Sequence, residues 1–369
     1  MGGRGAFHLR VLRPFDKLRA VPSKVEGRQA QDALSPSKGA GRTGEGHPST
    51  DGNGPDRTRG RCAVRSLAAL AVGGALLLST ACGSRSSAKH LIGFSQCNLG
   101  EPWRVAMNAD VAARAKDFAD LEIVFADAQQ DNAKQVADVE NFLRQRVDLL
   151  MISPNEAKPL TPVVERAFKA GVPVIVIDRG LEGDSFTTFI GADNYEIGRR
   201  AGEHIVEILQ GTGSIVEIRG LPGSPPAMDR SRGMHDAIAA QPGLQIIHSP
   251  VANWLREEAM AQMEMALAAH PRIDLVYGHN DPMAVGAYLA AKAKGRERDI
   301  KFIGIDALPG LDGGRQAVAD GKLDATFVYP TGGREAVELA ARILRGEQVP
   351  HRVVLKTEKI TRATAGAAR

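Results

Sequence analysis

Short apolar runs alternate with helical stretches along most of this 369-residue chain, and that alternation restricts what it can fold into. From residue 89 onward each run is rich in β-branched residues, ends in polar residues and precedes an amphipathic stretch with helical spacing. Strands that alternate with helices in this way form parallel sheets with right-handed crossovers. The runs predicted as strands are 90–94, 121–126, 148–152, 173–178, 187–192, 213–220, 244–249, 274–279, 301–306 and 325–330.

The segments between these strands carry the predicted helices. They cover 103–119, 132–146, 160–170, 194–210, 254–270, 281–294 and 333–345. So many strands exceed the usual number in one sheet, which is about four to six. We therefore expect an α/β fold with two doubly wound parallel-sheet lobes, the second beginning after Ala192.

The first 88 residues do not follow this pattern. Residues 1–63 show no sustained apolar period, so we interpret them as a disordered leader or as a gene-model extension before a true start near Val64. Basic residues then precede the apolar run 67–78, which is shorter than the roughly 20 residues that span a bilayer. Such a run is typical of a signal peptide, which we place at 64–81.

The signal peptide would end at a cysteine. The sequence STACGS around Cys82 resembles a bacterial lipoprotein cleavage box, which predicts lipidation of Cys82 and makes 82–88 a linker to the anchor. The alternative is ordinary secretion, with no role for Cys82. Both interpretations predict export to the periplasm or cell envelope.

The charge distribution argues against a nucleic-acid partner. Residues 1–81 hold 13 of the 47 Lys and Arg and 6 of the 43 Asp and Glu, which leaves 34 basic and 37 acidic residues in the remainder. A mildly acidic body offers no electrostatic footprint for a phosphate backbone. Cys97 is the single cysteine after Cys82, so no internal disulfide is expected, and the nine histidines lack metal-ligand spacing. We predict neither a metal nor a cofactor.

Polar and aromatic residues cluster just after the predicted strands. Ligands of open α/β sheets bind at the carboxyl ends of the strands, so these positions are the expected site. The two Trp residues of the chain, Trp103 and Trp254, both follow strands, one in each lobe. Aromatic rings can stack on the C–H faces of a sugar, while carboxylates, guanidinium groups and amides bind its hydroxyls. Blander interpretations are a solvated Asp178–Arg179 ion pair, core packing for either Trp, and a helix cap for Asp281.

Motifs for catalysis are missing from the sequence. No glycine-rich phosphate loop, dinucleotide fingerprint or nucleophile elbow follows a strand. Asp178 and Asp306 could imitate a glycosidase carboxylate pair, but each lies beside donors suited to holding hydroxyls. We therefore expect a binding protein and not an enzyme.

Several segments, in order, resemble one family. GFSQCNLGEPWR (93–104), DAQQDNAKQVADVENFL (127–143), GVPVIVIDRG (171–180), GADNYEIG (191–198), GHNDPMAVGAYLAA (278–291) and FIGIDALPG (302–310) are similar to segments of the type I periplasmic binding proteins for monosaccharides. The resemblance is to the ribose-binding-like branch, especially its galactofuranose-binding members and the periplasmic sugar sensors of hybrid histidine kinases. It covers roughly residues 89–355.

The resemblance implies a swap of lobes near the end of the chain and hence three hinge crossovers. Lobe 1 would comprise 89–192 plus 331–350, and lobe 2 would comprise 193–330 plus 351–365. The expected ligand-binding residues are Ser95, Gln96, Trp103, Arg104, Asn155, Asp178, Arg179, Asn194, Arg230, Trp254, Asn280, Asp306 and Tyr329. Tyr329 stands where the ribose-binding members have an amide, which favours a hexose or a furanose form over ribose.

The resemblance also implies the partners. A monomer would capture a monosaccharide and deliver it to the membrane permease of an ABC transporter, with the lipid anchor as its own contact with the membrane. The alternative is a sensing subunit that presents its closed form to a separate membrane histidine kinase.

Overall fold

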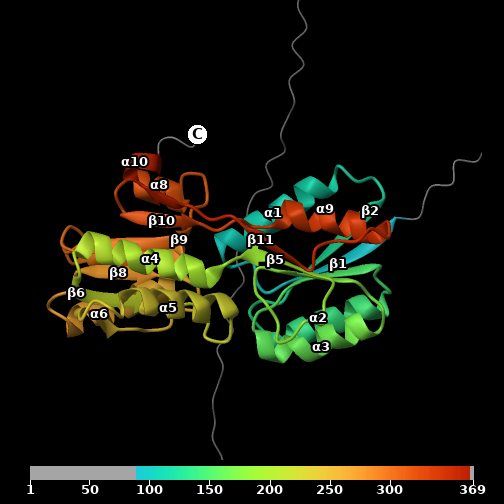
Figure 1. The fold of residues 1–369 in the computed structure, drawn as a ribbon, viewed down its shortest axis with the longest axis horizontal. Helices are drawn as coiled ribbons and strands as arrows, with labels where there is room; N and C mark the ends of the chain where they lie inside the picture. Colours follow the sequence, from blue (N-terminus) through green and yellow to red (C-terminus); the bar gives the residue numbers. More distant parts are fainter. Residues whose placement is uncertain (1–88, 366–369) are drawn as a thin grey trace, which may run out of the picture. The chain divides into compact units, whose positions relative to one another are not determined.

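A computed structural model describes residues 89–365, which fall within one compact unit of the chain. The predicted leader, signal peptide, Cys82 and linker lie outside the described residues. Two six-stranded sheets, each covered by helices on both faces, make up two lobes (Figure 1). The expected α/β fold with two doubly wound lobes is confirmed.

The first sheet is wholly parallel, with the strand order β11-β5-β4-β3-β1-β2. The central strands β3 and β4 are buried along their whole length, as parallel strands covered on both faces are. Its strands are β1 (His90–Gln96), β2 (Leu121–Asp127), β3 (Leu149–Ser153), β4 (Val174–Ile177), β5 (Thr188–Ala192) and β11 (Arg352–Leu355).

Two pairs of helices cover this sheet and complete lobe 1. One face packs on α1 (Pro102–Ala115) and α9 (Gly333–Leu344), and the other packs on α2 (Asn132–Arg144) and α3 (Ala157–Lys169) (Figure 1). The second helix begins where the Asp131 carboxylate accepts hydrogen bonds from the backbone N–H groups of Ala133 and Lys134. Val139 and Phe142 then form part of its buried face.

The second sheet has the strand order β12-β10-β9-β8-β6-β7. Its strands are β6 (Thr212–Ile218), β7 (Gly243–His248), β8 (Leu275–Gly278), β9 (Lys301–Asp306), β10 (Ala325–Val328) and β12 (Lys359–Thr361). All neighbours are parallel except β12, which pairs antiparallel with β10. The expectation of parallel sheets therefore holds for five of these six strands.

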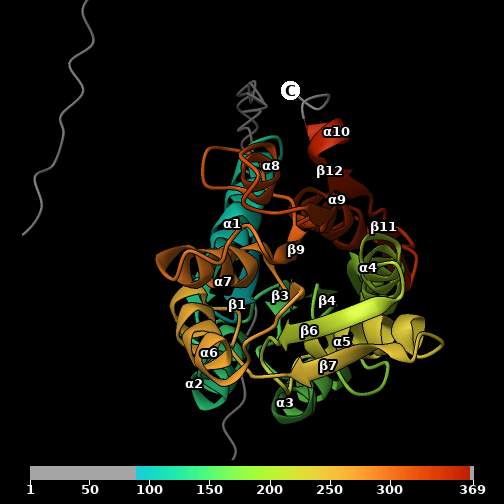
Figure 2. The same ribbon diagram turned by 90° about the vertical axis from the view of Figure 1, so that its left-hand side faces the viewer.

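Helices also cover both faces of the second sheet and complete lobe 2. One face carries α4 (Asn194–Leu209) and α5 (Pro225–Ile238), and the other carries α6 (Arg256–Ala269) and α7 (Asp281–Ala293) (Figure 2). Two short helices, α8 (Gly314–Ala319) and α10 (Arg362–Ala365), complete the lobe. Helices α5, α8 and α10 and strands β11 and β12 were not predicted from the sequence.

The chain passes between the lobes three times. It crosses between β5 and α4, between β10 and α9, and between β11 and β12. The last crossing differs from the expected boundary, because residues 351–365 were assigned to lobe 2 as one piece. Arg352–Leu355 instead pairs in parallel with β5 of lobe 1, so the chain returns to lobe 2 after Leu355.

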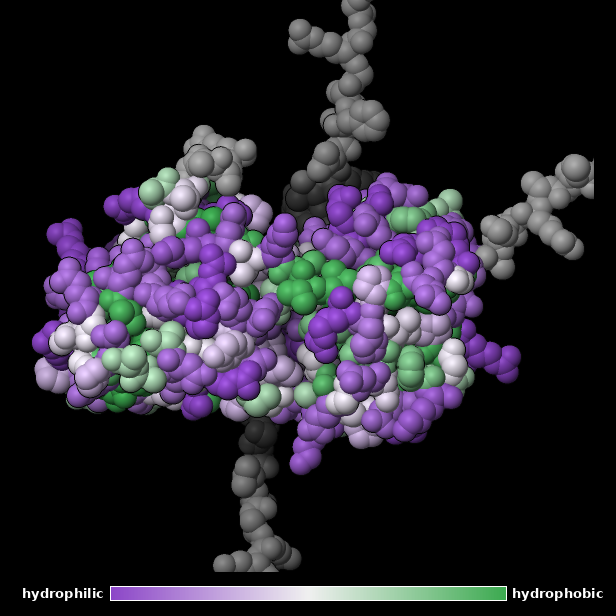
Figure 3. All heavy atoms as spheres, in the orientation of Figure 1, coloured by the Kyte–Doolittle hydropathy of each residue, from purple (hydrophilic) through white to green (hydrophobic). Residues whose placement is uncertain are grey.

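The molecular surface is mainly hydrophilic on the face shown in Figure 3. A hydrophobic patch interrupts it over the edge strand β11, where Val354 is exposed. No helix among residues 89–365 is long and apolar enough to cross a membrane.

Glycines let α4 and α5 approach closely. A Cβ added at Gly198 would lie 2.2 Å from the carbonyl oxygen of Arg230, and one at Gly233 would lie 2.1 Å from that of Tyr195. These are backbone atoms, so relief of the clash would require the two helices to separate. The crossing therefore sets the position of α5 and of Arg230 upon it.

We predict that Gly198→Ala lowers the free energy of unfolding by about 1–3 kcal/mol, because overpacking outweighs the better helix propensity of Ala. Chemical denaturation measures the change. Gly180→Ala is the control, since nothing lies within 4 Å of a Cβ there. An equal loss in both variants, or no loss at Gly198, would contradict this account.

Candidate functional site

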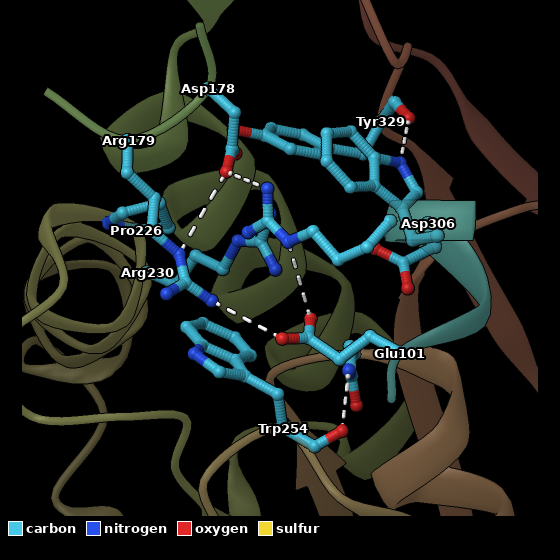
Figure 4. A pocket seen from close by; sticks show the side chains of 11 residues that line it. Glu101, Asp178, Arg179, Pro226, Arg230, Trp254, Asp306 and Tyr329 are labelled. Carbon is cyan, nitrogen blue, oxygen red and sulfur yellow. Dashed lines mark hydrogen bonds and ion pairs between the residues drawn. The ribbon is translucent and has the colours of Figure 1, made fainter. Parts of the chain in front are cut away.

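A cavity lies where the carboxyl ends of both sheets meet. Lobe 1 and lobe 2 both contribute side chains to its wall (Figure 4). The lining residues are Glu101, Trp103, Arg104, Asp178 and Arg179 of lobe 1 and Pro226, Arg230, Trp254, Asn280, Asp306 and Tyr329 of lobe 2. Each follows or ends a strand, as expected of ligand sites in open α/β sheets.

Asp178 is the most heavily paired acid of the cavity. Its Oδ2 lies 2.7 Å from Nη1 of Arg104, and its Oδ1 accepts a 2.6 Å hydrogen bond from the Tyr329 hydroxyl. Burial opposes ionisation, but Arg104, Arg179 and the Tyr329 hydroxyl together hold the pKa of Asp178 below its ordinary value. Asp178 is therefore a carboxylate at neutral pH, and its bond to Tyr329 joins the two lobes.

Arg179 is completely buried beside Asp178. Its Nη1 donates to the carbonyl oxygen of Asn155 at 2.9 Å, and its Nη2 lies 3.4 Å from Oε1 of Glu101. Glu101 also lies 3.7 Å from Nε of Arg104. Neither Arg104 nor Arg179 has a hydrogen-bond partner for its Nε among the described residues. Both guanidinium groups thus have an unused donor.

Arg230 lies between two aromatic rings of the cavity. Its guanidinium is 5.5 Å from the Trp254 ring centroid and 4.5 Å from that of Tyr329. Its Nε donates to Oδ1 of Asn194 at 2.9 Å, and its Nη1 donates to the carbonyl oxygen of His279 at 2.5 Å. These contacts fix the plane of the guanidinium, a geometry suited to paired hydroxyls.

Trp254 is held in an uncommon backbone conformation, with φ of 72°. The Asn280 amide donates to its carbonyl oxygen at 3.1 Å, while Asn280 Oδ1 caps α7 by accepting from the N–H of Met283. A Cβ at Gly220 would lie 2.3 Å from the indole ring, so only glycine fits there. The strained backbone is consistent with a functional position.

Asp306 contrasts with Asp178. It is 6% exposed and has φ of 135°, and its carboxyl oxygens accept no hydrogen bond from residues 89–365. Burial, and next the nearby Asp281, raise the pKa of Asp306 well above its ordinary value. A buried carboxyl group without a partner is costly, and a ligand hydroxyl would supply the missing donor.

Asp281 has a structural role beside the cavity. Its Oδ2 accepts from the N–H of Ala307 at 2.7 Å, and its Oδ1 accepts from the Thr326 hydroxyl at 2.6 Å. Burial raises its pKa to about 6. It lies outside the cavity lining and is not the N-cap of α7, which is Asn280. Asp281 instead holds the segment that follows Asp306.

Four of the predicted site residues lie behind the cavity wall. The Gln96 amide donates to Oδ1 of Asn108 at 3.0 Å, and Ser95 is fully buried. Asn155 holds Arg179, and Asn194 holds both Arg230 and the Tyr329 hydroxyl. These residues end or follow strands as predicted, but their side chains do not line the cavity.

Two lining residues were missed. Glu101 precedes Pro102 and Trp103 at the start of α1, where its spacing to Arg104 was the available signal. Pro226 lies in the first turn of α5, in a segment predicted as a loop. Within residues 89–365 no group of three or more His, Cys, Asp or Glu side chains could hold a metal ion.

Comparisons with known proteins match this chain over most of the described residues. The family model described as a periplasmic binding protein domain matches residues 92–348. A ribose import binding protein of Bacillus subtilis is 35% identical over 263 residues, which are 70% of this chain and 83% of that protein. A galactofuranose-binding protein of Escherichia coli is 32% identical over 64% of this chain and 76% of its own length.

Solved structures match as well. The fructose-binding periplasmic domain of a hybrid two-component system is 45% identical, with a TM-score of 0.73. The match covers 75% of this chain and 92% of that domain. The family resemblance seen in the sequence is therefore confirmed.

Because Asp306 has no hydrogen-bond partner among the described residues, we expect it to destabilise the folded protein more at high pH than at low pH. Its raised pKa means that the folded protein retains a proton that the unfolded chain loses above about pH 4, so its contribution to stability falls as pH rises. We expect Asp306→Asn, without sugar, to raise the melting temperature by at least about 2 °C at pH 7, and by less at pH 4.

Asp320→Asn is the matched control for this measurement. Asp320 is on the surface, and hydrogen bonds from Gln316 and Lys322 lower its pKa. Its carboxylate therefore stabilises the fold more at pH 7 than at low pH, so Asp320→Asn should lower the melting temperature more at pH 7 than at pH 4. A gain at Asp306 that does not depend on pH would contradict the assignment.

Proposed function

We propose that this chain, which belongs to the periplasmic binding protein family and is a sugar-binding protein of its ribose-binding branch, holds one monosaccharide in the cavity between its lobes. The carrying observation is the composition of the cavity wall. Three carboxylates and three guanidinium groups surround a small space, together with the rings of Trp103, Trp254 and Tyr329. Such a balanced set suits a neutral polyol better than an anion, because acceptors and donors are both present.

The size of a monosaccharide sets the affinity that is attainable. A hexose has about a dozen heavy atoms, and at roughly 0.3–1.5 kcal/mol each it could reach micromolar affinity, near −8 kcal/mol. The Trp254 indole offers a flat apolar surface for a sugar face, and its Nε1 has no partner among the described residues.

A hexose in furanose form is the favoured ligand class. The relatives named for galactofuranose and fructose support it, as does Tyr329 at the end of the cavity. The Tyr329 hydroxyl is engaged by Asp178 and Asn194, so it is not a free donor for the ligand.

Binding would proceed by closure of the lobes about the three crossovers. Contacts across the lobes support a closed form over the cavity. The Trp103 indole donates to the carbonyl oxygen of Tyr329 at 2.8 Å, and the N–H of Ala157 donates to the carbonyl oxygen of Gly223 at 3.2 Å. Closure exchanges the water on each sugar hydroxyl for a fixed protein group.

The partner that reads the closed form would be the permease of an ABC transporter, as the name of the ribose import relatives suggests for them. The second candidate is a separate sensor kinase, favoured by the 45% identity to a periplasmic domain of a two-component system. Two assays distinguish these partners. The sugar-loaded protein would stimulate the ATPase activity of the transporter in reconstituted vesicles if the partner is a permease, and it would change kinase autophosphorylation if the partner is a sensor kinase.

The remaining parts of the proposal concern location and chemistry. The protein would act in the periplasm as a monomer, anchored through a lipid on Cys82. It would bind the sugar without altering it, with no metal or cofactor. Intact-mass analysis of the membrane-bound protein tests the anchor, and turnover of glycosides by the pure protein would contradict the absence of catalysis.

We predict that Arg179→Ala and Asp306→Ala each weaken sugar binding by about 2–3 kcal/mol, because the first removes a donor from Glu101 and from the Asn155 carbonyl oxygen and the second leaves a sugar hydroxyl without its acceptor. Isothermal titration calorimetry with D-fructose measures the change. Arg166→Ala is the matched control, since Arg166 is exposed and pairs with Glu140 on the surface. Affinities near wild type for both cavity variants would refute the cavity as the binding site.

We expect D-fructose or a galactofuranose to raise the melting temperature more than D-ribose does. The physical reason is the additional hydroxyl group of a hexose, which can pair with the carboxyl and guanidinium groups of the cavity wall. A thermal-shift panel of D-fructose, D-galactose, L-arabinose and D-ribose measures the order. A larger shift with D-ribose would contradict the ligand class while leaving the sugar-binding function intact.

A further inference from the structure

Glu217, a buried carboxylate of lobe 2, lies outside the cavity and is not explained by it. It is the penultimate residue of β6 and is fully buried. Burial of an unpaired carboxylate costs several kcal/mol, so its partners are informative.

Three side chains from three different segments converge on this carboxylate. Its Oε1 lies 3.1 Å from Nε2 of His279. Its Oε2 lies 3.0 Å from Nε2 of His235 and accepts a 2.7 Å hydrogen bond from the Ser249 hydroxyl. Burial raises the pKa of Glu217, but the bonds from His235 and His279 outweigh it and lower the pKa, so the group is ionised.

His279 connects the carboxylate to Arg230. Its carbonyl oxygen accepts from Nη1 of Arg230 at 2.5 Å, and the next residue is Asn280. Its Nδ1 accepts from the N–H of Gly220 at 3.3 Å, which leaves Nε2 as the nitrogen that donates to Glu217. The carboxylate therefore selects the tautomer and the orientation of the ring.

The other two partners lead to the remaining cavity residues of this lobe. His235 is on α5, the helix that carries Arg230. Ser249 begins the segment that ends at Trp254, where two consecutive residues have positive φ, 47° at Asn253 and 72° at Trp254. The Trp254 and His279 ring centroids are 6.3 Å apart.

We propose that Glu217 is a positioning residue of the binding site. Its carboxylate holds His235, Ser249 and His279 together, and through them it sets the positions of Arg230, Trp254 and Asn280 relative to the sugar. This inference rests on the proposed function, because it assumes that the cavity is where the sugar binds.

Glu217→Gln tests the proposal with almost no change in volume. An amide has one acceptor oxygen where the carboxylate has two, so at least one of the three contacts must be lost or reverse its direction, and the negative charge is removed. We expect the dissociation constant for D-fructose, measured by calorimetry, to rise at least about fivefold. Glu203→Gln is the matched control, since Glu203 is an exposed carboxylate on α4 that pairs with Arg199.

A second measurement needs no sugar and separates positioning from general stability. The chain has two Trp residues, so its ¹⁵N-labelled form gives two indole signals, assigned with Trp103→Phe. In Glu217→Gln the Trp254 signal should shift more than that of Trp103, whose indole N–H donates to the Tyr329 carbonyl oxygen. Unchanged signals with unchanged affinity would overturn the proposal, as would equal shifts of both signals.

Two further variants keep the outcome decisive. If Glu217→Gln does not fold, His235→Ala removes one contact from a half-exposed position, and an unchanged dissociation constant would overturn the proposal. Asp306→Ala distinguishes the role of the cavity in sugar binding from the positioning role of Glu217. If it weakens D-fructose binding and Glu217→Gln does not, only the positioning role fails; if neither does, the cavity assignment fails as well.

Discussion

The burial of six ionisable side chains around one small cavity is the constraint on which the rest of the site depends. Glu101, Arg104, Asp178, Arg179, Arg230 and Asp306 are all between 0% and 6% exposed. Charges removed from water are tolerated when each has partners in good geometry, so the surrounding segments must hold them accurately. Asn155, Asn194 and the backbone carbonyl of His279 do this for the guanidinium groups. These polar groups behind the wall explain why a cavity lined by ions can exist in a compact protein.

Asp178 of lobe 1 and Asp306 of lobe 2, which both line the cavity, have opposite environments. Asp178 is satisfied by Arg104 and Tyr329, which lowers its pKa, whereas Asp306 has no donor among the described residues and its pKa is raised. The first contributes to holding the lobes together through the Tyr329 bond. The second costs stability until a hydroxyl reaches it. A binding site of this kind is less stable when empty than a fully paired core would be, and ligand binding recovers the difference.

Much of the fold could be predicted from the sequence, because β-branched runs and helical periodicity are strong local signals. Less could be predicted at the ends of the chain: β11 and β12 are four and three residues long and form only in contact with β5 and β10. The expectation that ligands bind at the carboxyl ends of the strands identified the correct loops, but it did not predict the orientation of each side chain. Gln96 faces α1 and not the cavity, and Glu101 was missed because its direction depends on how α1 begins after it. Helix α5 was not predicted because the glycines and prolines before it indicate a turn or loop.

A crystal structure of the protein grown with D-fructose tests the central claim most directly. The account predicts one sugar between the lobes, with a ring face against Trp254, hydroxyl groups donating to Asp306, and Arg179 and Arg230 donating to sugar oxygens. The Tyr329–Asp178 hydrogen bond should persist beside it. A sugar bound elsewhere on either lobe, or one in the cavity that leaves the Asp306 carboxyl group without a donor, would contradict the account.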